Sequence, residues 1–166
     1  VQPITCRQFE LQNFAHLKDQ DATFQLKFKA SEIGVYSIAF TDGTLAESYV
    51  TTFNYTTADT EQLVEFTINL DSTKLDFTIA NNERLFGITI AGDNNGDREI
   101  ADANKDTWQT GHFFTTDACV NWSTVLNAYV QIGDIQIEEG TVVTAVERPE
   151  VGSNLARCQR YYEEGD

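Results

Sequence analysis

The sequence predicts an all-β protein, a two-sheet antiparallel β-sandwich of jelly-roll type, and three observations support this prediction. First, apolar and polar residues alternate with a period of two in several successive segments, as they do in strands that bury one face. Second, Gly, Asn and Asp residues mark turns between those segments. Third, only one short stretch, near the C-terminus, has the spacing of a helix. Seven or eight strands with almost no helix are typical of a sandwich.

Five segments between residues 23 and 90 carry the strand pattern. In residues 23–29, Phe24, Leu26 and Phe28 alternate with polar residues, which indicates a strand with one face in the core and one face in water. The expected solvent-facing residues of this strand are Gln25, Lys27 and Lys29. Alternation, or a high content of aromatic and β-branched residues, also predicts strands over residues 34–40, 48–55, 61–70 and 84–90.

An irregularity in the pattern marks the strand expected over residues 128–137. Val130 and Ile132 fall at even positions, whereas Ile135 and Ile137 fall at odd positions. A shift of one residue would turn the apolar side chains toward water unless the strand accommodates an extra residue. The sequence therefore predicts a β-bulge at residues 133–134.

The end of the chain is expected to contain one more strand and a short closing segment. Residues 141–147 are predicted to form a strand after a turn at Gly140. In residues 153–163, Leu155, Cys158 and Tyr162 are spaced as on one face of a helix, and Ser153 or Asn154 could cap it. An extended conformation of this closing segment is the alternative.

Length and charge limit the classes of function. With 166 residues, the chain is expected to be a single domain over residues 1–166, and its start at Val1 with no Met in the sequence suggests a fragment of a longer protein. The net charge of −15 disfavours binding to nucleic acid, because the field of the protein repels phosphates. No run of about 20 apolar residues is present, so membrane insertion is not expected.

The loop at residues 93–97 is a candidate calcium site. Asp93, Asn95 and Asp97 provide oxygen ligands around a glycine, and Glu99 and Asp102 could add carboxylates. The same residues also suit a plain hairpin turn, because Asn and Gly tolerate a positive φ. The two interpretations stay open at the level of sequence.

A stretch rich in aromatic residues is a candidate glycan site. Sugars stack on exposed aromatic faces while polar side chains bind their hydroxyls, so Trp122 or Trp108 could act together with Asn121, Asp117 or Gln109. Aromatic residues more often fill cores or subunit interfaces. We expect Trp108 to be packed and Trp122 to be the more exposed of the two.

No arrangement of residues in the sequence predicts an enzyme. Glu138 and Glu139 are adjacent on a strand, so they point to opposite faces and cannot form the paired carboxylates of a glycosidase. His16 and His112 have no evident nucleophilic partner, and the three cysteines lack the spacing of a zinc site.

The C-terminal part of the chain resembles the end of a jelly-roll domain found in bacteriophage tail fibres and tail spikes. The resemblance is carried by three groups of residues: Gly133-Asp134-Ile135-Gln136-Ile137-Glu138-Glu139-Gly140, then Thr144 with Glu147-Arg148, and Cys158-Gln159-Arg160-Tyr161-Tyr162. Residues 14–17 and 23–31 resemble the opening of that domain, and residues 107–111 resemble its Thr-Trp-x-x-Gly motif. The chain departs from the pattern at Ile137, where Leu is usual, and at Val146, where Phe is usual.

The resemblance implies a function as well as a fold. It implies an extracellular component of the virion tail, a homotrimer at the receptor-binding tip that attaches to a glycan of the bacterial surface. Two alternatives remain: a structural domain that trimerises or caps the fibre without binding a receptor, and a carbohydrate-binding module of a bacterial enzyme. A fold by itself does not decide among them.

Overall fold

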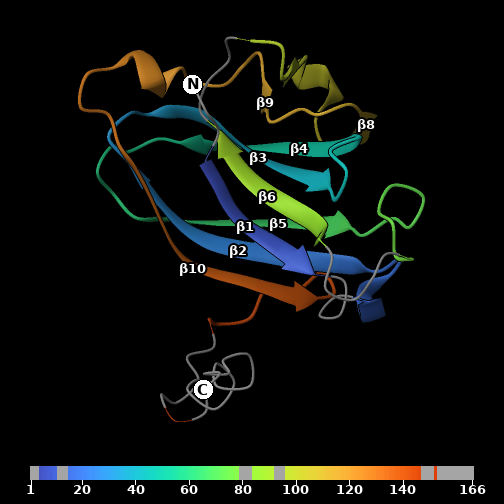
Figure 1. The fold of residues 1–166 in the computed structure, drawn as a ribbon. Helices are drawn as coiled ribbons and strands as arrows, with labels where there is room; N and C mark the ends of the chain where they lie inside the picture. The colour runs from blue at the N-terminus through green and yellow to red at the C-terminus, as the bar shows by residue number, and fades with distance from the viewer. Residues whose placement is uncertain (1–3, 11–14, 79–83, 92–95, 147–151, 153–166) are drawn as a thin grey trace, which may run out of the picture.

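A computed structural model describes residues 4–10, 15–78, 84–91, 96–146 and 152 of the chain. These residues form ten strands and three short 3₁₀ turns, in an order that Figure 1 shows. The elements are β1 (Ile4–Glu10), η1 (Ala15–Leu17), β2 (Asp21–Ala30), β3 (Gly34–Asp42), β4 (Glu47–Tyr55), β5 (Gln62–Asn69), β6 (Arg84–Ala91), β7 (Glu99–Ile100), η2 (Asp102–Asn104), β8 (Trp108–Thr110), β9 (Thr115–Thr116), η3 (Trp122–Thr124) and β10 (Val130–Glu139).

Two antiparallel sheets pack face to face and form a β-sandwich (Figure 1). The larger sheet has the strand order β1-β6-β3-β4-β8, and the smaller has the order β10-β2-β5. The chain passes from one sheet to the other after β1, β2, β4 and β5, which gives the sandwich its jelly-roll character. The predicted all-β sandwich is therefore confirmed, and all five strands expected between residues 23 and 90 are present.

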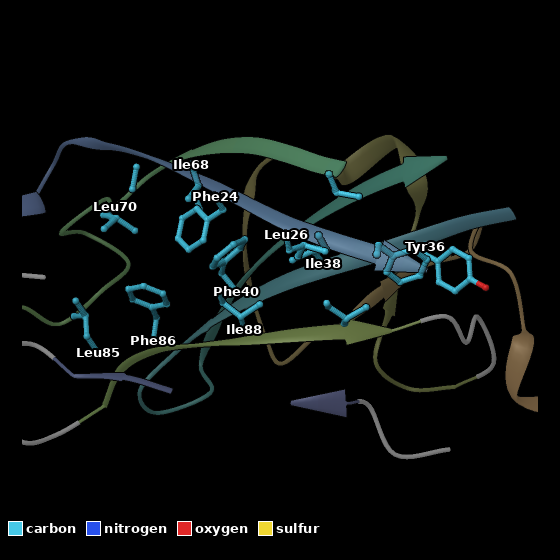
Figure 2. Close-up of a cluster of buried hydrophobic side chains, with 14 of the residues drawn as sticks. Phe24, Leu26, Tyr36, Ile38, Phe40, Ile68, Leu70, Leu85, Phe86 and Ile88 are labelled. Atoms are coloured by element: carbon cyan, nitrogen blue, oxygen red, sulfur yellow. The ribbon is translucent and has the colours of Figure 1, made fainter. Parts of the chain in front are cut away.

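The core lies between the two sheets and is rich in aromatic rings (Figure 2). Phe24 from β2 meets Phe40 from β3 with ring centroids 4.7 Å apart, and it stacks on Phe66 of β5 at 5.4 Å. Phe86 and Ile88 of β6 complete this part of the core from the larger sheet. The inward positions are those that the period-two alternation predicts, because successive side chains of a strand point to opposite faces.

The predicted β-bulge is present in β10. Gly133 lies opposite Lys27, and Gln136 lies opposite Gln25, so two residues of β10 oppose the single residue between those partners on β2. Asp134 takes up the irregularity with a φ of 46°. The bulge allows β10 to keep its apolar residues on the core side both before and after the shift in phase.

The strand expected after Gly140 is absent from residues 141–146, and this prediction is wrong for them. Gly140 makes the expected turn, with a φ of 96°, and the chain then bonds to side chains instead of pairing with a strand. The Gln25 side-chain amide donates to the Thr144 carbonyl at 2.6 Å, and the Thr144 amide donates to the Glu138 carboxylate at 2.8 Å.

This segment also changes the outer face of β2. Thr23 donates to the Gly140 carbonyl at 2.5 Å, and Thr23 and Gln25 are each only 3% exposed. The expectation that Gln25 faces solvent is therefore wrong, because a later part of the chain covers it. Lys27 and Lys29, farther along the same face, remain partly exposed as predicted. The closing segment predicted over residues 153–163 lies outside the described residues.

The outer face of the larger sheet is covered in part by residues 97–120. Ile100, Phe113 and Phe114 pack against Ala39 and Val50 and form a second, smaller core. The short parallel pair of β7 and β9 belongs to this unit. As a result β3 is buried on both faces, and periodicity alone did not predict this cover.

None of the helical turns in the described part of the chain has the length and apolar character needed to cross a membrane.

Candidate functional site

Trp122 lies in η3, within the loop that joins β9 to β10. Figure 1 shows this loop in orange at the end of the sandwich where β2 leads into β3. The loop is tied to the sheet by the Val120 amide, which donates to the Val35 carbonyl at 2.8 Å. Trp122 is half-buried and packs against the main core with part of its ring system. It is thus neither fully exposed, as a free platform would be, nor fully enclosed.

Polar groups surround this turn and fix its shape. The Ser123 hydroxyl donates to the Asn121 side-chain carbonyl at 2.9 Å, and the Thr124 hydroxyl donates to the Asn121 main-chain carbonyl at 2.9 Å. The Val125 amide closes the turn on the Trp122 carbonyl at 3.1 Å. The side-chain amide of Asn121 therefore has a defined orientation, and its NH₂ group keeps donor capacity for a ligand.

Two further loops meet the Trp122 loop at the same end of the sandwich. The Ser31 amide donates to the Tyr129 carbonyl at 3.1 Å, and the Tyr129 amide donates to the Ser31 hydroxyl at 3.0 Å. The Asp59 amide donates to the Ala30 carbonyl at 2.9 Å, which brings in the loop that follows β4. The Tyr129 hydroxyl bonds to the Asp59 carboxylate, and this bond raises the pKa of Tyr129 to about 12.

Trp108 lies elsewhere and is packed differently. It pairs with Tyr49 across β8 and β4, with ring centroids 5.8 Å apart, and its indole N–H is buried without a hydrogen-bond partner among the described residues. Tyr49 lies opposite Phe40, whereas the Trp122 loop is tied to Val35. Five residues along a strand span about 17 Å. The two tryptophans therefore do not form one platform.

Asp117 and Asn121, the polar residues predicted beside the tryptophans, have separate positions. Asp117 accepts the Asp102 amide at 2.8 Å and so belongs to the unit formed by β7 and β9. Asn121 is part of the Trp122 turn. Gln109 lies on β8 beside Trp108. Of the polar residues predicted for the glycan site, only Asn121 therefore lies in the Trp122 turn.

The predicted calcium loop is described only in part. Asp93 and Asn95 lie outside the described residues, and Asp97 is exposed. The Asp102 carboxylate already binds Lys105 at 2.9 Å and the Thr116 hydroxyl at 3.1 Å, and the bond from Lys105 is the main cause of its lowered pKa. Within the described ranges, no group of three or more His, Cys, Asp or Glu side chains is placed to hold a metal ion. The calcium site remains a prediction.

The residues of possible catalytic interest have structural contacts. The His112 ring meets Phe114 edge-on at 4.4 Å, and burial, followed by the charge of Arg98, lowers its pKa. The Thr144 hydroxyl and then the Thr144 amide lower the pKa of Glu138, because both donate to its carboxylate. Cys119 is buried beside the Thr116 hydroxyl, 3.6 Å from it.

Tyr129 and Asp59 lie at the same end of the sandwich as Trp122 and Asn121, and we call these four residues the end-loop cluster. Sequence reasoning missed Tyr129 and Asp59. They are 70 residues apart, and no spacing rule connects them. Their meeting depends on the pairing of Val130 with Ala30, which brings both loops to one end.

No protein-family model, curated protein or solved structure matches this chain.

Proposed function

We propose that this chain is a non-enzymatic domain of a bacteriophage tail fibre or tail spike, and that it attaches the virion to its bacterial host by binding a surface glycan. The observation that carries the proposal is the end-loop cluster, in which Trp122 and Asn121 lie at the same end as Tyr129 and Asp59. The resemblance of the C-terminal motif to tail-fibre domains supports the viral context. The β-sandwich supports a binding site at this end, since loops at the end of a rigid scaffold commonly carry binding residues.

The chemistry of the cluster suits a sugar. A pyranose presents apolar C–H groups on its faces and hydroxyls at its rim. The partly exposed indole ring of Trp122 can contact the C–H groups. The Asn121 amide offers a donor to the hydroxyls, and the Asp59 carboxylate offers an acceptor. Because Trp122 is anchored in the core by part of its ring, little side-chain entropy is lost when a ligand contacts the rest.

A second candidate function is supported by two apolar side chains at the same end. Leu126 is 88% exposed and Ile33 is 59% exposed, on two loops that meet there. Exposed apolar groups that cluster often mark an interface. A domain that trimerises or caps a fibre without binding a receptor would bury them between subunits. The homotrimer is itself part of our proposal for the adhesin.

The test of glycan binding uses an array of bacterial surface polysaccharides and labelled protein. We expect the native chain to bind a restricted set of glycans, Trp122→Ala to abolish this binding, and Asn121→Ala to weaken it at least tenfold. Asn121→Ala keeps the tryptophan but removes the acceptor of the Ser123 hydroxyl, so its melting temperature is compared with that of the native chain. Val142→Ala is the matched control, because Val142 is exposed but lies on the segment after β10.

Light scattering tests the trimer that both candidates require, and the glycan array separates them, because only the adhesin binds a glycan. A trimer has a mass near three times 18.6 kDa. If Leu126→Asp dissociates the trimer and the native chain binds no glycan on the array, the structural function replaces the adhesin. If Trp122→Ala binds every glycan as well as the native chain does, the proposed site is wrong.

A further inference from the structure

A hollow lies on the outer face of the smaller sheet, and at one side it reaches the pair of Lys29 and Gln131, next to the end loops. It has a volume of about 240 Å³ and lies over β2 and β10, beside the residue that precedes β5. Its polar lining consists of Lys27, Lys29, Glu61, Gln131 and Asp134. Alternation on β2 connects Lys27 with Lys29, but no spacing in the sequence connects them with Glu61, Gln131 or Asp134.

The β-bulge creates this hollow. The extra residue of the bulge places Asp134 with a φ of 46° and directs its carboxylate to the Lys27 ammonium at 3.0 Å. Bulges commonly redirect a side chain in this way next to functional sites. Glu61 approaches the same ammonium at 2.9 Å, so Lys27 is held between two carboxylates.

Gly133 keeps the hollow open. It lies directly opposite Lys27 in the register of β10 and β2, and a Cβ atom built on it would meet no atom within 4 Å. Its φ lies outside the left-handed region, so the backbone does not require a glycine there. The absence of a side chain therefore leaves space rather than relieving strain.

The hollow is electrically balanced in a strongly acidic protein. Two ammonium groups, Lys27 and Lys29, face two carboxylates, Glu61 and Asp134, although the whole chain carries a net charge of −15. The hydrogen bond from Glu61, and then that from Asp134, raises the pKa of Lys27, so the ammonium stays protonated at neutral pH. Lys29 makes no ion pair with a described residue and lies opposite Gln131, so both can donate to a ligand.

We propose that this hollow binds one neutral sugar ring. Each hydroxyl of a sugar both donates and accepts, and the lining offers carboxylates as acceptors beside ammonium and amide groups as donors. An acidic ligand gains nothing from a pocket with no net charge, and the field of the protein repels it. The volume is below the roughly 300–1,000 Å³ of pockets for drug-sized ligands, which fits a single ring rather than a longer chain.

This inference rests on the proposed function for its class of ligand, a sugar, but not for its residues. Trp122 packs on the core at the end of the sandwich, whereas the hollow opens on the outer face of the smaller sheet. The lining includes none of the end-loop residues Trp122, Asn121, Tyr129 and Asp59, so the site would contact a second sugar unit or a branch of a surface glycan.

The test is a titration of the ¹⁵N-labelled chain, followed by amide chemical shifts. Glucose, galactose, mannose and N-acetylglucosamine are the neutral probes, and glucuronate is the acidic one. We expect at least one neutral sugar to give saturable shifts at the amides of residues 27–29 and 131–134. Gly133→Leu fills the hollow and should weaken this binding at least tenfold while the melting temperature stays close to that of the native chain.

Gly96→Leu is the matched control, because a Cβ at Gly96 also meets no atom within 4 Å. Trp122→Ala should leave these shifts unchanged, which separates a failure of this inference from a failure of the adhesin site. The inference is overturned if no neutral sugar shifts these amides, if Gly133→Leu binds as well as the native chain, or if glucuronate alone binds.

Discussion

Asp42 is a buried carboxylate that organises the turn between β3 and β4, and its removal is predicted to be costly. It is 7% exposed and accepts the backbone amides of Thr44 at 3.0 Å, Ala46 at 2.6 Å and Glu47 at 2.9 Å, together with the Thr44 hydroxyl. Asp76 makes a similar pair of bonds to Thr78, but in an exposed loop. The two residues therefore form a natural comparison of the same turn chemistry in two environments.

The expected magnitude follows from what each substitution leaves unpaired. Asp42→Ala removes the acceptor of three backbone amides, and a buried donor left without a partner costs about 1–3 kcal/mol. Water can reach the amides of Thr44 and Ala46, which are exposed, so we expect a total loss of about 2–4 kcal/mol. Asp76→Ala should change the free energy of unfolding by no more than about 0.5 kcal/mol, as is usual for a surface position.

The effect of Asp42 should also depend on pH. Burial alone raises the pKa of Asp42, but the hydrogen bonds from Glu47, Thr44 and Ala46 outweigh it and leave the pKa lowered. A carboxyl whose pKa is lowered by folding stabilises the folded state above its unfolded pKa, near 4, and loses this contribution as the pH falls through the folded pKa. The stability difference between the native chain and Asp42→Ala should therefore shrink below about pH 4.

The assay is equilibrium unfolding in urea, followed by tryptophan fluorescence, at pH 7 and at a series of lower pH values. Equal losses for Asp42→Ala and Asp76→Ala would refute the argument from burial. A difference between the native chain and Asp42→Ala that stays constant down to pH 3 would refute the argument from ionisation.

Three further predictions test the packing of the sandwich. Gly43→Ala places a Cβ 2.2 Å from the backbone carbonyl of Arg84, so it should lower the melting temperature sharply in calorimetry. The control Gly96→Ala meets no atom within 4 Å and should leave the melting temperature unchanged. Equal melting temperatures for the two variants would contradict this. Phe24→Ala, which removes a fully buried ring, should cost about 3–5 kcal/mol in urea unfolding, and a loss below about 1 kcal/mol would show that the core is not packed as described. Cys119 is 2% exposed, so its thiol should react with a thiol reagent only after unfolding. The measurement uses a variant in which the other two cysteines are serine, and fast reaction in the native state would argue against the burial of Cys119.

Strands β2 to β6, β10 and the bulge could be predicted from the sequence because they depend on local order, whereas β1, β7, β8 and β9 were not predicted. Alternation in Phe24, Leu26 and Phe28 identifies β2, and the change of phase between Ile132 and Ile135 identifies the bulge. In both cases one face of a strand must be buried, and the two-residue period of a strand leaves only one way to arrange the side chains.

The covered faces and the binding sites depended on contacts between distant parts of the chain. The pattern of β2 indicates that Gln25 faces outward, but only the tertiary structure shows that Thr144 covers it. The meeting of Tyr129 with Asp59, and of Lys27 with Glu61 and Asp134, likewise needs the sheet register. Periodicity is a local property, and it is enough to predict the class of fold and the inward face of strands with a clear alternation, such as β2 and β5. The tertiary structure decided which polar groups share a site, because that depends on which strands become neighbours.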